Sequence, residues 1–221
     1  MSFENKEELE PAFKEVIKSC DYLLLQKEIP MSLVKASSCY AHSLGKTVIL
    51  DCGGQDEPIS EETLGHITYI SPNETELMRL DPTIKLGEDY NFKNIVEEIR
   101  SKLLVKHPKL SVLLKLGGRG AALISSDLAV EGPSVTLTHP EVLDKFKIVD
   151  TVGAGDCFTG AFAVSHSELN WGDKSKWEEN YRQAMRFGNS SAFLCITKCG
   201  AMPSMPLRKE VEDFMQGYPA K

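Results

Sequence analysis

Short apolar runs, each followed at once by a polar cluster, constrain the fold more than any other feature of this sequence. They are separated by longer segments whose apolar residues recur at helical spacing, as in Ile95, Val96 and Ile99. Strands that alternate with helices favour a mainly parallel sheet covered by helices on both faces, a three-layer α/β architecture. The expected strands are Tyr22–Gln26, Val48–Leu50, Ile67–Ile70 and Val112–Leu114.

The remaining segments predict further helices and one stretch of β-structure. Helices are expected over 4–20, from Pro30 to a glycine cap at Gly45, over 153–168, over 175–195 and around 207–215. β-structure is expected over 131–149, with a loop around His139 and Pro140. No internal repeat or low-complexity linker interrupts the chain, so we expect a single domain over 1–221.

Composition narrows the class of protein. Hydrophobic residues make up 42% and charged residues 26% of the sequence, as in ordinary globular proteins. A net charge of -7 without a long basic run argues against a nucleic acid or an anionic membrane as a partner. The N-terminus is acidic and polar, and no apolar run is long enough to span a bilayer, so we expect a cytoplasmic location. The 6 cysteines lack zinc spacing and are interpreted as free thiols.

The turn Gly153-Ala154-Gly155-Asp156, placed before a small and apolar run, is the strongest candidate site. A helix start offers unpaired N–H groups and the positive end of the helix dipole to an anion, and glycines allow a phosphate to approach closely. Asp156 would then accept a proton from an attacking hydroxyl. An ordinary helix start with an acidic first turn explains the same residues equally well. A Walker A loop lacks its Lys here, and a dinucleotide fingerprint lacks its third Gly or Ala at Phe158.

Polar residues at other strand ends have both a structural and a functional interpretation. Asn73 and Glu76 fit a helix N-cap with a capping box, the segment 115–120 fits a tight turn between strands, and Gln26–Glu28 fits a solvated strand end. Parallel sheets also bind ligands beyond the carboxyl ends of their strands. The same residues are therefore candidates for a ligand site.

Residues 150–160, which contain Asp-Thr-x-Gly-Ala-Gly-Asp, closely resemble the second signature of the ribokinase-like (PfkB) carbohydrate kinases. The resemblance implies that Asp156 is the catalytic base and that Gly153, Ala154 and Gly155 form the anion hole. Pro72–Glu76 is similar to the Asn-x-x-Glu motif of the family. That similarity implies that Asn73 lies in the nucleotide site and that Glu76 acts on Mg²⁺ through water.

The resemblance also implies nucleotide, cation and sugar contacts. Asn189 would lie near the adenine of ATP, and Glu28 would contact the sugar. The glycine-rich turn beside the ATP phosphates and ribose would be Lys115, Leu116, Gly117, Gly118, Arg119 and Gly120. A site for K⁺ would take Asp150, Ser204 and the backbone carbonyls of Val152, Cys195, Lys198 and Gly200.

By resemblance, the expected function is ATP-dependent phosphorylation of a sugar, with O5 of D-ribose as the acceptor. Fructokinase or adenosine kinase activity is the nearest alternative, and a non-catalytic nucleotide-binding module is the second class. The family's early Gly-Gly sugar motif and its lid have no counterpart here. We therefore expect the sugar-binding half of the domain to be truncated at its N-terminal side. A homodimer is expected for the complete protein. The 221-residue chain is then expected to bind Mg-ATP weakly and not to phosphorylate ribose at a useful rate.

Overall fold

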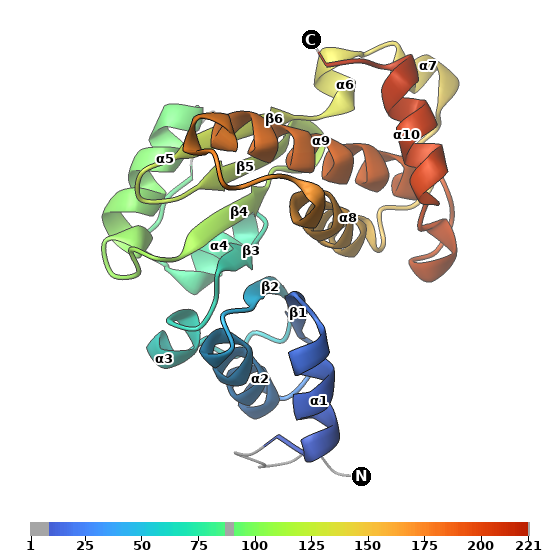
Figure 1. Ribbon diagram of the computed structural model, residues 1–221. Coiled ribbons are helices and arrows are strands. Elements are labelled where there is room, and N and C mark those ends of the chain that lie inside the picture. Colours follow the sequence, from blue (N-terminus) through green and yellow to red (C-terminus); the bar gives the residue numbers. More distant parts are fainter. Residues whose placement is uncertain (1–8, 87–90, 221) are drawn as a thin grey trace. The chain divides into compact units, whose positions relative to one another are not determined.

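The computed structural model describes residues 9–86 and 91–220, which fall into two compact units (Figure 1). The described residues up to Leu114, together with Ile124–Leu128, form the first unit. Lys115–Leu123 and the described residues from Ala129 onward form the second. Each unit has its own helices and its own buried side chains. A single kinase domain over 1–221 stays a prediction.

The first unit is built on parallel strands. The strands follow one another in the order β1 (Tyr22–Lys27), β2 (Thr47–Gly54), β3 (Tyr69–Ser71) and β4 (Ser111–Lys115), whose last residue belongs to the second unit. Val48, Ile49 and Leu50 of β2 are all 0% exposed, so both faces of this strand are covered. Burial of both faces is characteristic of parallel sheets between helices. The predicted α/β class with a mainly parallel sheet is confirmed.

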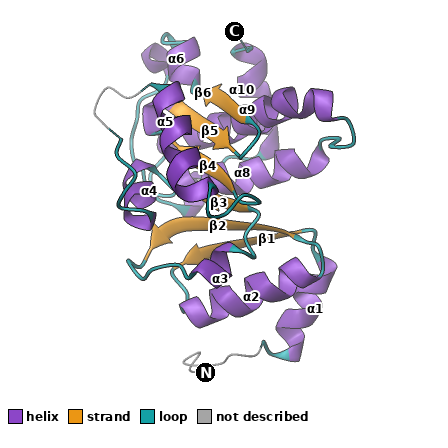
Figure 2. Ribbon diagram, turned by 90° about the vertical axis from the view of Figure 1, so that its left-hand side faces the viewer, coloured by secondary structure: helices purple, strands orange, loops and turns teal. Residues whose placement is uncertain are grey.

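The helices of the first unit are α1 (Pro11–Ser19), α2 (Met31–Ser43), α3 (Glu61–Leu64), α4 (Glu74–Leu80) and α5 (Phe92–Ile99), which continues into a π-helical turn, Arg100–Leu104. Helix α2 packs on β1 and β2 (Figure 2). It ends at the predicted cap: Gly45 has a φ of 68°, and the N–H groups of Gly45 and Lys46 donate to the carbonyls of His42 and Ala41. Residues 4–8 of the first predicted helix lie outside the described residues.

Strand β1 differs from the fully buried strand that its apolar sequence predicts. Leu25 is 7% exposed, whereas Leu24 on the opposite face is 43% exposed. Successive side chains of a strand point to opposite faces, so one face of β1 is open within this unit. Apolar composition alone does not show whether a second layer covers a strand.

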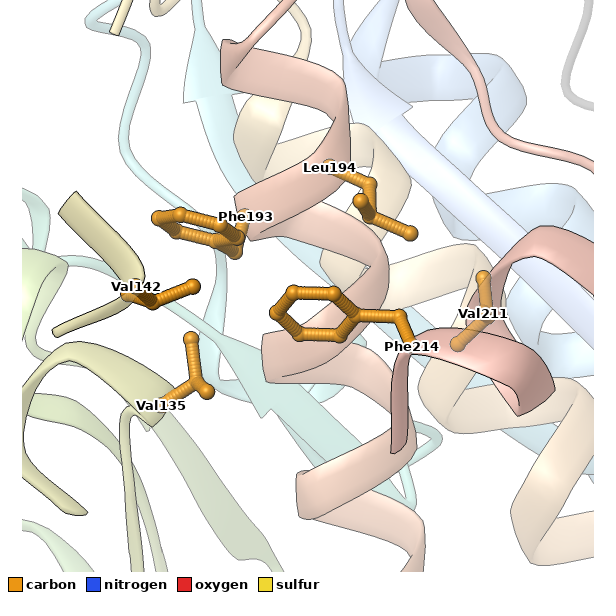
Figure 3. Close-up of a cluster of buried hydrophobic side chains, with 6 residues drawn as sticks. All are labelled: Val135, Val142, Phe193, Leu194, Val211 and Phe214. Atoms are coloured by element: carbon orange, nitrogen blue, oxygen red, sulfur yellow. The ribbon is translucent and has the colours of Figure 1, made fainter. Parts of the chain in front are cut away.

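The second unit contains the strands β5 (Gly120–Ile124), except for its last residue, and β6 (Ala129–Pro133). Its helices are α6 (Val135–Thr138), α7 (Val142–Lys145), α8 (Ala154–Glu168), α9 (Trp177–Ile196) and α10 (Arg208–Gly217). Helices α8 and α9 lie side by side (Figure 1). A Cβ atom at Gly188 of α9 would lie 2.8 Å from the Phe158 ring of α8, so the glycine allows this close packing. Buried side chains of α6, α7, α9 and α10 form one core (Figure 3), namely Val135, Val142, Phe193, Leu194, Val211 and Phe214.

The β-structure predicted over 131–149 is wrong beyond Pro133, where the short helices α6 and α7 follow instead. Ser134 caps α6, since its Oγ accepts a hydrogen bond from the Leu137 N–H at 3.3 Å. Val135 and Val142 then point into the helical core of the unit. β-branched residues in this segment favour strands by propensity, and burial against helices overrides that preference. The helices predicted over 153–168, 175–195 and 207–215 are confirmed as α8, α9 and α10.

Candidate active site

The glycine turn lies at the N-terminus of α8, as the sequence predicts. Gly153 is the N-cap and has a φ of 80°. A Cβ atom there would lie 3.0 Å from Ala201 Cα, so both the conformation and the packing require glycine. Asp156 follows in the first helical turn and is exposed. The N–H groups of Ala154 and Gly155 belong to the first turn, where a helix offers its dipole to an anion.

Lys115, at the end of β4, brings a positive charge to this turn. Its Nζ lies 3.4 Å from the position that a Cβ atom of Gly155 would occupy. Lys115 and Gly155 are 40 positions apart in the sequence and belong to the same unit. An ammonium group beside the start of a helix adds to the attraction that this end of α8 exerts on a phosphate.

The turn that follows Lys115 is tied to the start of α6. Gly117–Arg119 form one turn of 3-10 helix, and Gly117 and Gly120 have φ angles of 53° and 104°. The Gly118 carbonyl accepts hydrogen bonds from the hydroxyls of Ser134, at 2.5 Å, and Thr136, at 3.2 Å. The turn is therefore held in one conformation by side chains that the sequence analysis did not single out. A Ser placed just before a helix was the available signal.

Asn189 of α9 is 9% exposed and lines a cavity of about 100 Å³ in the second unit. Its Nδ2 donates to the Gly132 carbonyl at 2.7 Å. The cavity is also lined by Pro133 and Val135, next to the residues that hold the 115–120 turn. Arg186, whose pKa is lowered by burial, closes another side and donates to the carbonyls of Met215 and Tyr218, both at 2.9 Å.

Asp150 joins the turn before α8 to the loop after α9. Its carboxylate accepts hydrogen bonds from the Val152 N–H at 3.0 Å and from the Gly200 N–H at 2.9 Å. These backbone donors hold the pKa of Asp150 below its usual range, so the group is ionised at neutral pH. The ionised carboxylate supplies negative oxygens, as the predicted cation site requires, although both oxygens already accept backbone N–H bonds.

Contacts join three of the other predicted cation ligands, Val152, Cys195 and Ser204, to one another. Cys195 Sγ lies 3.0 Å from Ser204 Oγ and 3.9 Å from the Val152 carbonyl oxygen. Ser204 is fully buried, whereas the Lys198 side chain extends to Glu210 at 3.1 Å. Cys195 Sγ thus lies near both the Ser204 hydroxyl and the Val152 carbonyl, and a K⁺ site among these residues and Asp150 stays a prediction. Beside it, burial and the neighbouring Cys195 raise the pKa of the Cys157 thiol to about 12, which keeps it protonated and unreactive.

In the first unit, Asn73 and Glu76 form the capping box of α4. Asn73 Oδ1 accepts from the Glu76 N–H at 2.9 Å, and Glu76 Oε2 accepts from the Asn73 N–H at 2.8 Å. Asn73 Nδ2 also donates to Glu76 Oε1 at 2.9 Å. The structural interpretation of this motif is confirmed. Each carboxylate oxygen keeps a free lone pair, so the same Glu76 can still accept a hydrogen bond from a metal-bound water.

A second carboxylate lies close to Glu76. A Cβ atom at Gly53 would lie 3.3 Å from Asp51 Oδ1 and 3.7 Å from Glu76 Oε1, and Asp51 is 6% exposed. These two carboxylates fit a hydrated Mg²⁺, which keeps several of its waters. Groups of three or more metal-ligating side chains are absent from the described residues. Asp51 was not among the predicted site residues, because its approach to Glu76 depends on the pairing of β2 with β3.

Glu28 lies at the end of β1 and is exposed. Its Cγ is 2.9 Å from the position that a Cβ atom of Gly54 would occupy, so only glycine fits beside it. Its carboxylate makes no hydrogen bond or ion pair with residues 9–86 or 91–220. Glu28, Asp51 and Glu76 therefore gather at the carboxyl ends of the strands of the first unit.

None of the helices in the described parts of the chain has the length and apolar character of a membrane span.

Comparison with known proteins shows the family of the chain. Residues 1–208 match the model of the pfkB family carbohydrate kinase. The chain is 37% identical over 201 residues to the ribokinase of Arabidopsis thaliana, covering 89% of this chain and 46% of that protein. It is 30% identical over 201 residues to the ribokinase of Bacillus subtilis, covering 91% of this chain and 57% of that protein.

Among solved structures, Arabidopsis thaliana ribokinase complexed with ribose and ATP is similar with a TM-score of 0.77 and 34% identity. The similarity covers 96% of this chain and 61% of that chain. The predicted ribokinase-like fold class is thereby confirmed. The chain spans about half the length of the curated relatives that it matches.

Proposed function

Because the chain belongs to the pfkB family of carbohydrate kinases, we propose that it carries the nucleotide-binding and catalytic residues of a ribokinase-type sugar kinase. The reaction would convert ATP and D-ribose to ADP and D-ribose 5-phosphate. One observation carries the proposal: Asp156 and the Lys115 ammonium lie at the same N-terminus of α8, where a phosphate would be held. A general base and an anion site are the two parts that phosphoryl transfer to an alcohol needs.

In this proposal Asp156 takes the proton from O5 of ribose as the oxygen attacks the γ-phosphorus. The bond between that phosphorus and the bridging oxygen breaks, and its electron pair leaves with ADP. The N–H groups of Gly153, Ala154 and Gly155 stabilise the charge on the transferred oxygens, and Lys115 adds a positive charge beside them. Exposure of Asp156 leaves the base accessible to the acceptor.

The nucleotide would extend from Asn189 to the glycine turn. The cavity lined by Asn189 and Pro133 would receive the adenine, and the 115–120 turn would run along the ribose and phosphates. Mg²⁺, held through water by Glu76 with Asp51 beside it, would neutralise phosphate charge. K⁺ near Asp150 and Ser204 would order the turn without entering the reaction. Glu28 would contact the sugar.

A non-catalytic nucleotide-binding module is a second candidate. It is favoured by the proposed sugar contacts of the described residues, because outside the catalytic turn these consist of Glu28 alone. A cytoplasmic location and a homodimer of the complete protein stay predictions from the sequence.

The two candidates differ in ribose-dependent ADP formation by the 221-residue chain. We expect Mg-ATP binding by calorimetry and slow turnover with ribose, above the rates with fructose or adenosine. Asp156→Asn should lower turnover at least about 100-fold and leave ATP affinity within about threefold, because it removes the base and keeps the shape. Asp144→Asn, an exposed carboxylate on α7, is the matched control.

ATP binding without turnover on any acceptor would identify the nucleotide-binding module and refute the kinase. If Asp156→Asn kept more than about a tenth of the turnover, the assignment of the base would be wrong. Absence of ATP binding would refute both candidates.

A further inference from the structure

Arg186 of α9 is a half-buried cation that has no carboxylate partner among the described residues. Its Nη2 donates to the carbonyls of Met215 and Tyr218, both at 2.9 Å. A charged group that leaves water has to be paired or hydrogen-bonded, because it loses its hydration. The two carbonyls at the end of α10 therefore hold this guanidinium, to which the sequence analysis assigned no role.

The end of α10 needs this donor because of one proline. In a continuing helix the Met215 carbonyl would accept a hydrogen bond from the N–H group four positions later. That position is Pro219, which has no N–H group. Arg186 supplies the missing donor and places a positive charge at the negative end of the helix dipole. It thereby fixes the direction in which the chain leaves α10.

A second side chain holds the residues that follow α10. His139, which lies between α6 and α7 and is 6% exposed, donates from Nε2 to the Pro219 carbonyl at 2.8 Å. Nε2 is the donor because a carbonyl oxygen only accepts. The His139 ring also meets the Tyr218 ring edge-on, with the ring centroids 5.5 Å apart. Arg186 and His139 thus bind consecutive carbonyls of the C-terminal segment, residues 218–220.

The C-terminal segment is a wall of the cavity that Asn189 lines. All three of its residues line this cavity, and Arg186 lines it from α9. The segment lies outside the helices and strands and runs beside α6 (Figure 1). Residues without regular secondary structure depend on such side-chain bonds for a fixed conformation. The cavity therefore keeps its shape on this side through Arg186 and His139.

We propose that Arg186 is a positioning residue for the nucleotide: it holds the C-terminal segment in place as a wall against the adenine of ATP. This inference rests on the proposed function, which assigns the adenine to this cavity. Arg186 acts through the two carbonyls and not through the phosphates, which the α8 turn and Lys115 would hold. A ligand that has the phosphates but lacks the adenine should therefore bind equally well without Arg186.

The test is calorimetric titration of the 221-residue chain with Mg-ATP and with Mg-tripolyphosphate, which has the phosphates and lacks the adenosine. Arg186→Met removes the guanidinium and keeps an apolar stem. Lys209→Met is the matched control, since Lys209 is a cation of α10 that pairs with Asp213 at 3.0 Å and does not line the cavity. Urea unfolding checks that each variant is folded. Arg186→Gln, whose side chain is too short to bridge both carbonyls, replaces Arg186→Met if the latter is not.

We expect Arg186→Met to bind Mg-ATP at least about tenfold more weakly than the wild type does and Mg-tripolyphosphate within about threefold. The Lys209 variant should bind both ligands as the wild type does. Hydrogen exchange at the Tyr218 and Ala220 amides should be at least about tenfold faster in Arg186→Met, because the segment is released.

Three results would overturn the proposal. The first is an unchanged affinity of Arg186→Met for Mg-ATP. The second is an equal loss for both ligands, which would show that the charge of Arg186 attracts the phosphates. The third is a loss of ATP affinity without faster hydrogen exchange, which would show that Arg186 contacts the nucleotide directly.

A double variant tests whether Arg186 and His139 hold the same wall. His139→Ala removes the donor to Pro219, and its loss of ATP affinity should not multiply with that of Arg186→Met, since each change releases the same segment. A loss equal to the product of the two single losses would show independent roles and would overturn the shared wall. Absence of Mg-ATP binding by the wild type would refute the proposed function and this inference together. Binding of ATP that Arg186→Met leaves intact would refute only the inference.

Discussion

An alanine in place of Gly120 would meet the main chain at the end of β6. Its Cβ atom would lie 2.2 Å from the Gly132 carbonyl oxygen, 2.5 Å from the Ser134 nitrogen and 2.7 Å from the Pro133 carbonyl carbon. All three are backbone atoms, so no side chain can rotate away. Gly120 also has φ 104° and ψ -129°, a conformation that residues with a side chain rarely adopt.

These two effects set the size of the expected loss. A residue forced into a sparsely populated backbone region costs about 1–3 kcal/mol. Insertion of a methyl group into close-packed structure costs about 1–3 kcal/mol more. Gly120→Ala should therefore lower the free energy of unfolding by about 2–6 kcal/mol, a large part of the total of about 5–15 kcal/mol. Gly118→Ala, in the same turn, is the control, since its Cβ would meet no heavy atom within 4 Å.

Urea unfolding followed by tryptophan fluorescence measures this loss. The 2 tryptophans of the sequence, Trp171 and Trp177, both belong to the second unit, as does Gly120. With a slope of about 2 kcal/mol per molar urea, the midpoint should fall by about 1–3 M for Gly120→Ala. If Gly120→Ala unfolded within about 0.5 kcal/mol of Gly118→Ala, the close approach of the 115–120 turn to Gly132 would be refuted.

Two further predictions concern pH and cations. His166 is 6% exposed, and burial lowers its pKa to about 4. The unfolded chain binds this proton near pH 6.5, so stability is full above pH 6.5 and falls towards pH 4 by at most about 1.4 kcal/mol per unit. Urea midpoints across this range should fall less for His166→Phe, and equal slopes would contradict the assignment. Ribose-dependent turnover should rise when K⁺ replaces tetramethylammonium at equal ionic strength, and Asp150→Asn should remove the rise. A flat wild-type response would exclude the cation site.

Several features follow from the sequence because they depend on residues only a few positions apart. The alternation of apolar runs with helical periodicity predicts the α/β class, and β1 to β4 confirm it. The cap at Gly45 and the capping box of Asn73 and Glu76 close hydrogen bonds within one turn of chain. The helix start at Gly153 belongs to the same group, since its glycine conformation and first-turn carboxylate are local.

Other features were decided only by the tertiary structure. Gly200 donates to Asp150 across 50 positions, and Asn189 donates to Gly132 across 57, so no local pattern contains these pairs. Packing also turned 134–145 from predicted strand into α6 and α7, because Val135 and Val142 gain burial against helices. Lys27 shows the same limit: its polar sequence predicts exposure, and the surrounding loop and α4 bury it. Hydrogen bonds between residues a few positions apart can be predicted from the residue types alone. The burial of a side chain depends on which distant segments of the chain pack together.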